Sequence, residues 1–88
     1  MKTLHWVRDG SLPAWLETHK HLLGKTDAFL VSESALGTLP DSSPVLQIIY
    51  ARKSDIENSK ATVPNYVVLK SDAEWVELVL SFQQQVTW

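Results

Sequence analysis

The four residues Ala28-Phe29-Leu30-Val31, "AFLV", decide the fold class of this chain. They form a continuous apolar run, in which no polar residue alternates with an apolar one. Such a run is typical of a strand that is covered on both faces, as the strands of a parallel sheet are. The run therefore indicates a sheet with helices packed on both of its sides.

Other short runs before and after it are also typical of strands. Three of them are Thr3–Val7 ("TLHWV"), Val45–Tyr50 ("VLQIIY") and Tyr66–Leu69 ("YVVL"). At the end of the chain, Val86 and Trp88 alternate with polar residues, as in a last short strand with one buried face. The chain thus contains four or five candidate strands.

A helix is predicted between the first two strands. Ser11 stands at the N-cap position, Pro13 lies in the first turn, and Gly24 is expected to end the helix. The apolar residues recur at helical spacing. They are Leu12, Trp15, Leu16, His19, Leu22 and Leu23. A shorter helix is expected to begin at Ser32 or Ser34, and one helical turn is expected near Asp55.

The final helix has a clear start. Ser71 and Glu74 fit a capping box, in which each side chain bonds the backbone of the other residue. Its apolar face consists of Trp75, Leu78, Val79 and Phe82, and Val76 and Leu80 make it wider. So wide an apolar arc predicts either a helix held between two layers or a helix partly covered by a partner.

Strands and helices thus alternate along 88 residues, a length that supports one hydrophobic core. We therefore predict an α/β fold: a single three-layer domain, 1–88, with a mostly parallel sheet of four to five strands and helices on both faces.

The composition argues against several classes of function. The net charge is −2, and only Arg52 and Lys53 are adjacent basic residues, so direct nucleic-acid binding is not expected. There is no apolar run long enough to span a membrane and no recognisable signal peptide, so we expect a cytoplasmic protein. Without cysteine, the chain cannot form a disulfide, a thiolate metal site or a persulfide.

No self-contained active site is visible in the sequence. The serines Ser32, Ser34, Ser42 and Ser43 match no nucleophile motif. Three glycines are too few for a dinucleotide or phosphate loop. The loop carboxylates Asp41, Asp55 and Glu57 have no visible partner for acid–base chemistry. We therefore predict no catalytic residue and no cofactor.

The three histidines do not suggest a metal site. His19 and His21 are two residues apart, so they point away from each other on a helix. His5 could be added as a further ligand. Glu17 and His21 share a helix face, but two ligands from one helix do not make a site. We expect His19 to lie at the edge of the apolar face. An enzyme that uses His19 with Glu17 or Glu33 remains an alternative.

A series of short motifs runs from one end of the chain to the other. In order they are Leu4-His5-Trp6, Ile48-Ile49-Tyr50-Ala51, Asp55-Ile56, Tyr66–Leu69, Asp72-Ala73-Glu74-Trp75 and Gln85-Val86-Thr87-Trp88. With these motifs the chain resembles the TusB/DsrH family of sulfur-relay proteins over nearly its whole length. Two positions depart from the family pattern. Glu33-Ser34-Ala35 replaces an Asp-Gly pair followed by Val or Ile, and His19 occupies the position at which some members carry cysteine.

The resemblance implies a cysteine-free, non-catalytic subunit of a sulfur-relay complex. Such a complex passes sulfur to the wobble uridine of tRNA, giving 2-thiouridine. TusC-like and TusD-like subunits are implied as partners, in a heterohexamer with two of each, and the TusD-like subunit is implied to hold the reactive cysteine. Whether the pathway is tRNA thiolation or the oxidation of reduced sulfur stays open.

Terminal tryptophans are usually docked, either on their own core or on another chain. The candidate partner interface comprises Trp75, Val76, Leu80 and Trp88. The alternative to the sulfur-relay subunit is a stand-alone homodimeric binding module with the same fold.

Overall fold

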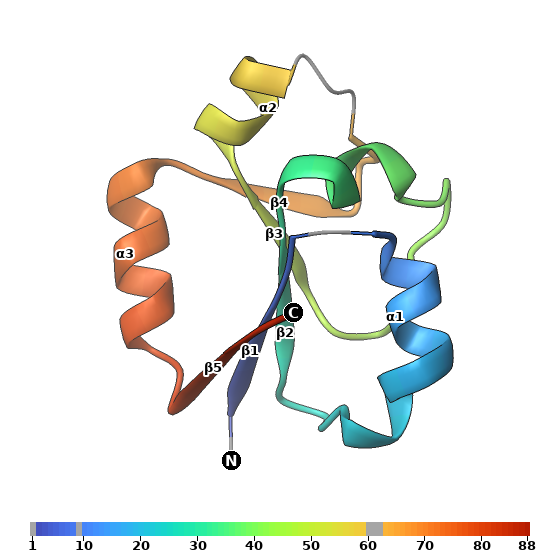
Figure 1. The fold of residues 1–88 in the computed structure, drawn as a ribbon. Helices are drawn as coiled ribbons and strands as arrows, with labels where there is room; N and C mark the ends of the chain where they lie inside the picture. Colours follow the sequence, from blue (N-terminus) through green and yellow to red (C-terminus); the bar gives the residue numbers. More distant parts are fainter. Residues whose placement is uncertain (1, 9, 60–62) are drawn as a thin grey trace.

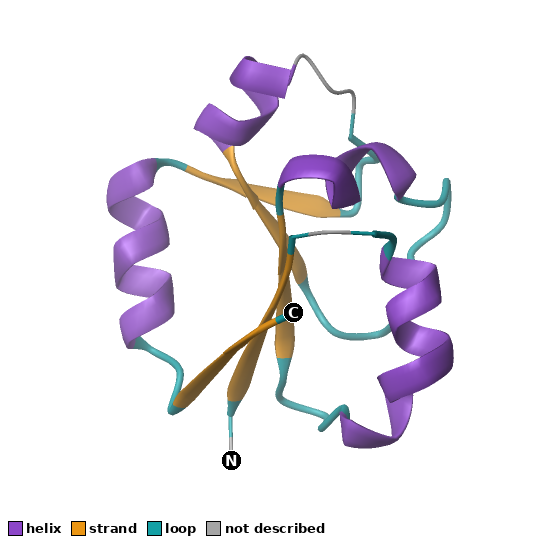
Figure 2. Ribbon diagram, in the orientation of Figure 1, coloured by secondary structure: helices purple, strands orange, loops and turns teal. Residues whose placement is uncertain are grey.

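The computed structural model describes residues 2–8, 10–59 and 63–88. An all-parallel sheet is formed by the strands β1 (Thr3–Val7), β2 (Ala28–Val31), β3 (Ile49–Arg52), β4 (Val67–Lys70) and β5 (Gln84–Thr87). Their order in the sheet is β4-β3-β2-β1-β5. The helices are α1 (Leu12–His19), α2 (Lys53–Ser59) and α3 (Asp72–Leu80), with 3-10 segments η1 (Lys20–Leu22) and η2 (Glu33–Thr38). The predicted α/β class is confirmed (Figures 1 and 2).

The strand order explains why helices cover both faces. Strands β2, β3 and β4 are added on one side of β1, and the chain then crosses back to place β5 on the other side. Parallel connections are right-handed, so reversing the direction of strand addition moves the helix to the opposite face. Accordingly α1 and α3 lie on opposite sides of the sheet (Figure 1).

The run that predicted the parallel sheet forms its central strand, and all four of its residues are buried. Phe29 and Val31 face a core that includes Trp15 of α1. Ala28 and Leu30 face the opposite core, on which Trp75 and Val79 of α3 pack. Strand β2 is therefore covered on both faces, as a continuous apolar run requires.

Several predicted elements differ in extent, the third strand and the first helix most of all. Strand β3 begins at Ile49 rather than Val45, and the preceding residues form bends. The first helix becomes a 3-10 segment after His19 and does not extend to Leu23 as one α-helix, so Leu22 is half-exposed instead of facing the core.

Gly24 does not end the helix in a left-handed conformation. Among the described glycines, only Gly10 has a positive φ, of 79°. The backbone N–H of Gly24 instead donates to the side chain of Asp27, at 2.9 Å.

Helix α3 begins as predicted. The Ser71 hydroxyl accepts from the backbone N–H of Glu74, and the Glu74 carboxylate accepts from the backbone N–H of Ser71. The Ser71 backbone N–H, helped by the Ser71 side chain, lowers the pKa of Glu74, because it stabilises the ionised carboxylate. Within the described residues, no helix is both long and apolar enough to cross a membrane.

Candidate partner surface

Trp75 attaches α3 to the sheet. Its ring meets that of Trp6 edge-on at 5.9 Å, and the Arg52 guanidinium lies 4.9 Å from the centre of the Trp75 ring. Arg52 is held in place by Asp55, whose two oxygens accept from Arg52 at 2.9 and 3.0 Å. The sequence did not reveal this partner of Asp55. The two residues form an ion pair that orients the Arg52 guanidinium.

The outer side of α3 is apolar and open. Val76 and Leu80 are 50% and 79% exposed. The helix is therefore not held between two layers of this chain. Of the two predicted explanations for its wide apolar arc, the first is wrong, and coverage by a partner stays a prediction.

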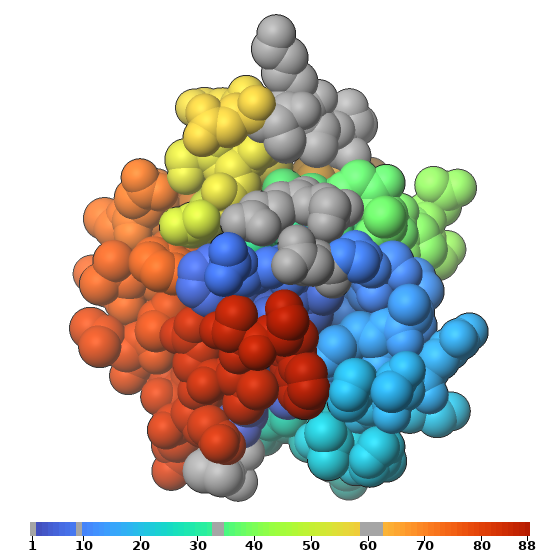
Figure 3. All heavy atoms as spheres, in the orientation of Figure 1, coloured from blue at the N-terminus to red at the C-terminus, as the bar shows by residue number. Residues whose placement is uncertain are grey.

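Trp88 lies on the opposite face of the sheet from α3, against the core of its own chain. Its ring is 5.4 Å from the ring of Trp15 and 4.5 Å from that of His19. The backbone N–H of Trp88 donates to the carbonyl of Trp6 at 2.9 Å, extending the pairing of β5 with β1 by one residue. In Figure 3 the C-terminal segment, in red, lies between α3 and α1. The four candidate interface residues therefore do not form one surface.

A buried hydrogen-bond network joins the last residue to the centre of the protein. The indole N–H of Trp88 donates to Nδ1 of His5 at 3.2 Å. Nε2 of His5 lies 2.9 Å from one oxygen of Asp27. His5 and Asp27 are only 3% and 6% exposed, so every polar atom in this network needs a partner inside the protein.

The environment of Asp27 favours its ionised form. Burial alone would raise the pKa of this carboxyl. The N–H groups of Gly24 and Thr3 and the imidazole of His5 outweigh that effect, and the pKa is lowered. The sequence did not point to Asp27, because two of its three partners, Thr3 and His5, lie in β1, more than 20 residues away.

His19 is packed between aromatic rings, as expected for the edge of the apolar face. It stacks on Trp15 at 5.3 Å and lies beside Trp88, and its Nδ1 is buried without a hydrogen-bond partner. Within the described part of the chain, no group of three potential ligands could hold a metal ion. Of the Glu33-Ser34-Ala35 segment, Ala35 is fully buried in the core, and all three residues belong to η2.

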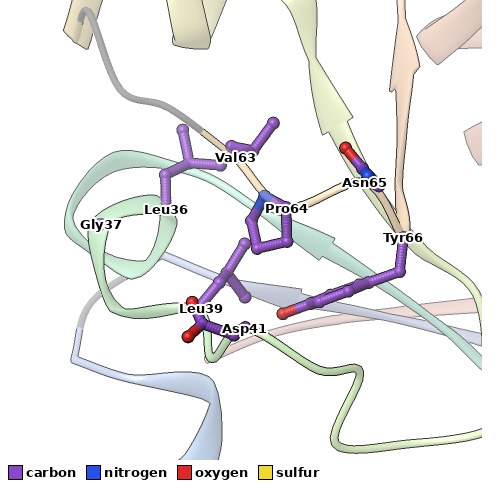
Figure 4. Close-up of a pocket in the computed structure, with 8 residues that line it drawn as sticks. All are labelled: Leu36, Gly37, Leu39, Asp41, Val63, Pro64, Asn65 and Tyr66. Atoms are coloured by element: carbon purple, nitrogen blue, oxygen red, sulfur yellow. The ribbon is translucent and has the colours of Figure 1, made fainter.

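One hollow lies where η2 and the start of β4 meet, and we call it the Tyr66 hollow (Figure 4). Its volume is about 520 Å³. It is lined by Leu36, Gly37, Leu39, Asp41, Val63, Pro64, Asn65 and Tyr66. Burial and the nearby Asp41 carboxylate raise the pKa of Tyr66, whose hydroxyl donates to the carbonyl of Pro40 at 2.6 Å. The Tyr66 hydroxyl is thus protonated and already donates a hydrogen bond to Pro40, so it is not suited to act as a base.

The second hollow has a volume of about 220 Å³ and lies beside the C-terminal half of α3; we call it the Lys25 groove. Its exposed apolar residues include Leu46 and Ile48, which were predicted to belong to a strand. Because β3 begins only at Ile49, both side chains lie at the surface instead. The strand-like pattern of Val45–Tyr50 did not indicate that these two side chains would be exposed.

Comparisons with known proteins provide no family assignment. No family model matches this sequence, and no curated protein matches it significantly. The resemblance to the TusB/DsrH family therefore stays an expectation drawn from the sequence motifs.

Proposed function

We propose that this chain is a non-catalytic structural subunit of a cytoplasmic sulfur-relay complex that serves 2-thiolation of the wobble uridine of tRNA. TusC-like and TusD-like subunits are its proposed partners. In this role the chain gives its neighbours a rigid apolar surface and leaves the sulfur chemistry to a cysteine on another subunit.

The exposed outer side of α3 carries the proposal. Val76 and Leu80 project from a helix that is itself firmly attached to the sheet through Trp75. An exposed apolar patch on the surface of a protein often marks a protein–protein contact. The absence of cysteine fits a supporting role, because the chain cannot carry sulfur as a persulfide.

The test is deletion of the chain from its host, followed by measurement of 2-thiouridine in digested tRNA. We expect the modification to be lost and to be restored by the wild-type chain, but not by Leu80→Asp. Leu22→Asp is the matched control, because Leu22 is 51% exposed but lies on the α1 side of the chain. Unchanged 2-thiouridine in the deletion strain would exclude the proposed role.

The alternative is a stand-alone homodimeric binding module. The observation that favours it is the same exposed helix face, since Val76 and Leu80 are equally available to a second copy of the chain. Retention of full 2-thiouridine in the deletion strain, together with association of the purified chain, would favour this alternative.

A further inference from the structure

The Lys25 groove has the dimensions of a protein-docking site. Its apolar lining comprises Ala28, Leu46, Ile48, Tyr50, Leu78 and Phe82. Its volume of about 220 Å³ is below the roughly 300–1,000 Å³ of pockets for drug-sized ligands. One or two aliphatic side chains from another protein surface suit it better.

The charges around the groove are unbalanced. Lys2 and Lys25 line it, and both residues are exposed. The Lys2 ammonium lies 4.7 Å from the centre of the Phe82 ring, so one positive charge stands directly beside the apolar wall. Asp27 also lines the groove, but its oxygens already accept from Thr3, His5 and Gly24. The groove therefore combines apolar side chains with two exposed lysines, beside the polar residues Thr26 and Gln47.

The chain itself presents a surface of the opposite kind. The outer side of α3 carries Val76 and Leu80 four residues apart, with Glu77 between them, and all three are exposed. Residues at this spacing lie on one side of a helix. This side is apolar and acidic, whereas the groove is apolar and basic.

We propose that the Lys25 groove of one copy binds the outer side of α3 of a second copy, with Glu77 facing Lys25. Val76 and Leu80 then cover Leu46 and Ile48, and the carboxylate meets the Lys25 ammonium. Packing two α3 helices directly on each other is less favourable, because it would bring Glu77 close to its own counterpart. Two copies related by a two-fold axis can make the contact twice, since each copy carries both the Lys25 groove and the outer side of α3.

This inference deepens the self-association alternative and rests on it, but not on the sulfur-relay role. The test is sedimentation velocity of the purified full chain from about 1 µM to 1 mM, a range that covers weak dimers. We expect the wild type to associate, and the association to weaken as salt is raised. Lys25→Glu and Glu77→Lys should each weaken it by about tenfold or more, because each places like charges opposite each other.

The double variant Lys25→Glu with Glu77→Lys restores opposite charges across the contact and should recover most of the association. Mixing the two single variants should also give association, because the mixed dimer pairs Lys25 with Glu77 at one contact and the two substituted side chains, with their charges reversed, at the other. Leu22→Asp is the control that leaves association unchanged, and equal thermal melting at low concentration verifies that the variants fold. A wild type that stays monomeric up to 1 mM, or a double variant that fails to recover, would overturn the proposal. Either result leaves the 2-thiouridine test of the relay role unaffected.

Discussion

The indole N–H of Trp88 donates to Nδ1 of His5 at 3.2 Å, so the last residue of the chain is bonded to its first strand. An indole can only donate, and Nδ1 must therefore act as the acceptor. The proton of the neutral imidazole then lies on Nε2, which donates to Asp27 at 2.9 Å. The network of Trp88, His5 and Asp27 thus uses both nitrogens of the ring.

Replacing Trp88 should destabilise the isolated chain. Trp88→Ala removes a half-buried ring from the core and leaves Nδ1 of His5 without its donor, so we expect a loss of about 2–3 kcal/mol in the free energy of unfolding. Urea denaturation measures it. Trp88→Phe keeps an aromatic ring but not the N–H, and should lose less. An unchanged unfolding curve for Trp88→Ala would show that the ring does not stabilise the isolated chain.

Asp27 should make stability depend on acid pH. Its folded-state pKa is lowered from the usual value near 3.8, so its contribution is complete above that value and is lost as pH falls through the lowered pKa. We expect Asp27→Asn to lower the free energy of unfolding at pH 7 by about 1–3 kcal/mol. Urea denaturation from pH 2 to 7 should show the variant approaching the wild type below pH 4. A constant difference between the two curves would contradict this assignment.

His19 should be replaceable by phenylalanine. The Phe ring can keep the stacking on Trp15 and Trp88, and it removes a buried Nδ1 that has no hydrogen-bond partner. We therefore expect His19→Phe to melt at the same temperature as the wild type or higher. We also expect it to restore 2-thiouridine fully in the deletion strain. Loss of function in a normally folded variant would instead favour an enzyme that uses the imidazole.

Two glycines offer a matched comparison of backbone strain. A Cβ atom at Gly10 or Gly37 would meet nothing within 4 Å, but only Gly10 has a positive φ. Gly10→Ala should therefore lower the free energy of unfolding by about 1 kcal/mol, whereas Gly37→Ala should be neutral or raise it by about 0.5 kcal/mol. Chemical denaturation of both variants gives the comparison. Equal effects would mean that the positive φ carries no cost.

Much of the fold follows from local patterns. Ala28–Val31 predicted a strand buried on both faces because an unbroken apolar run leaves no side that tolerates water, and the strand lies at the centre of the sheet. The start of α3 was equally predictable, since Ser71 and Glu74 cap the helix within four residues. The end of α1 was harder to predict. Leu22 continues the helical spacing of the apolar residues, but its side chain is half-exposed and does not pack on the core.

Contacts between distant segments account for the rest. Nothing local indicates that Asp27 bonds Thr3 and His5, or that Leu46 and Ile48 lie at the surface beside α3. Spacing along the chain reveals which residues share one side of a helix or strand, but which sides meet depends on the strand order. The sequence by itself therefore determined the α/β class, the central strand and the cap of α3. Only the tertiary structure decided that Trp88 docks on its own core, because its partners belong to β1 and α1, more than 60 residues away.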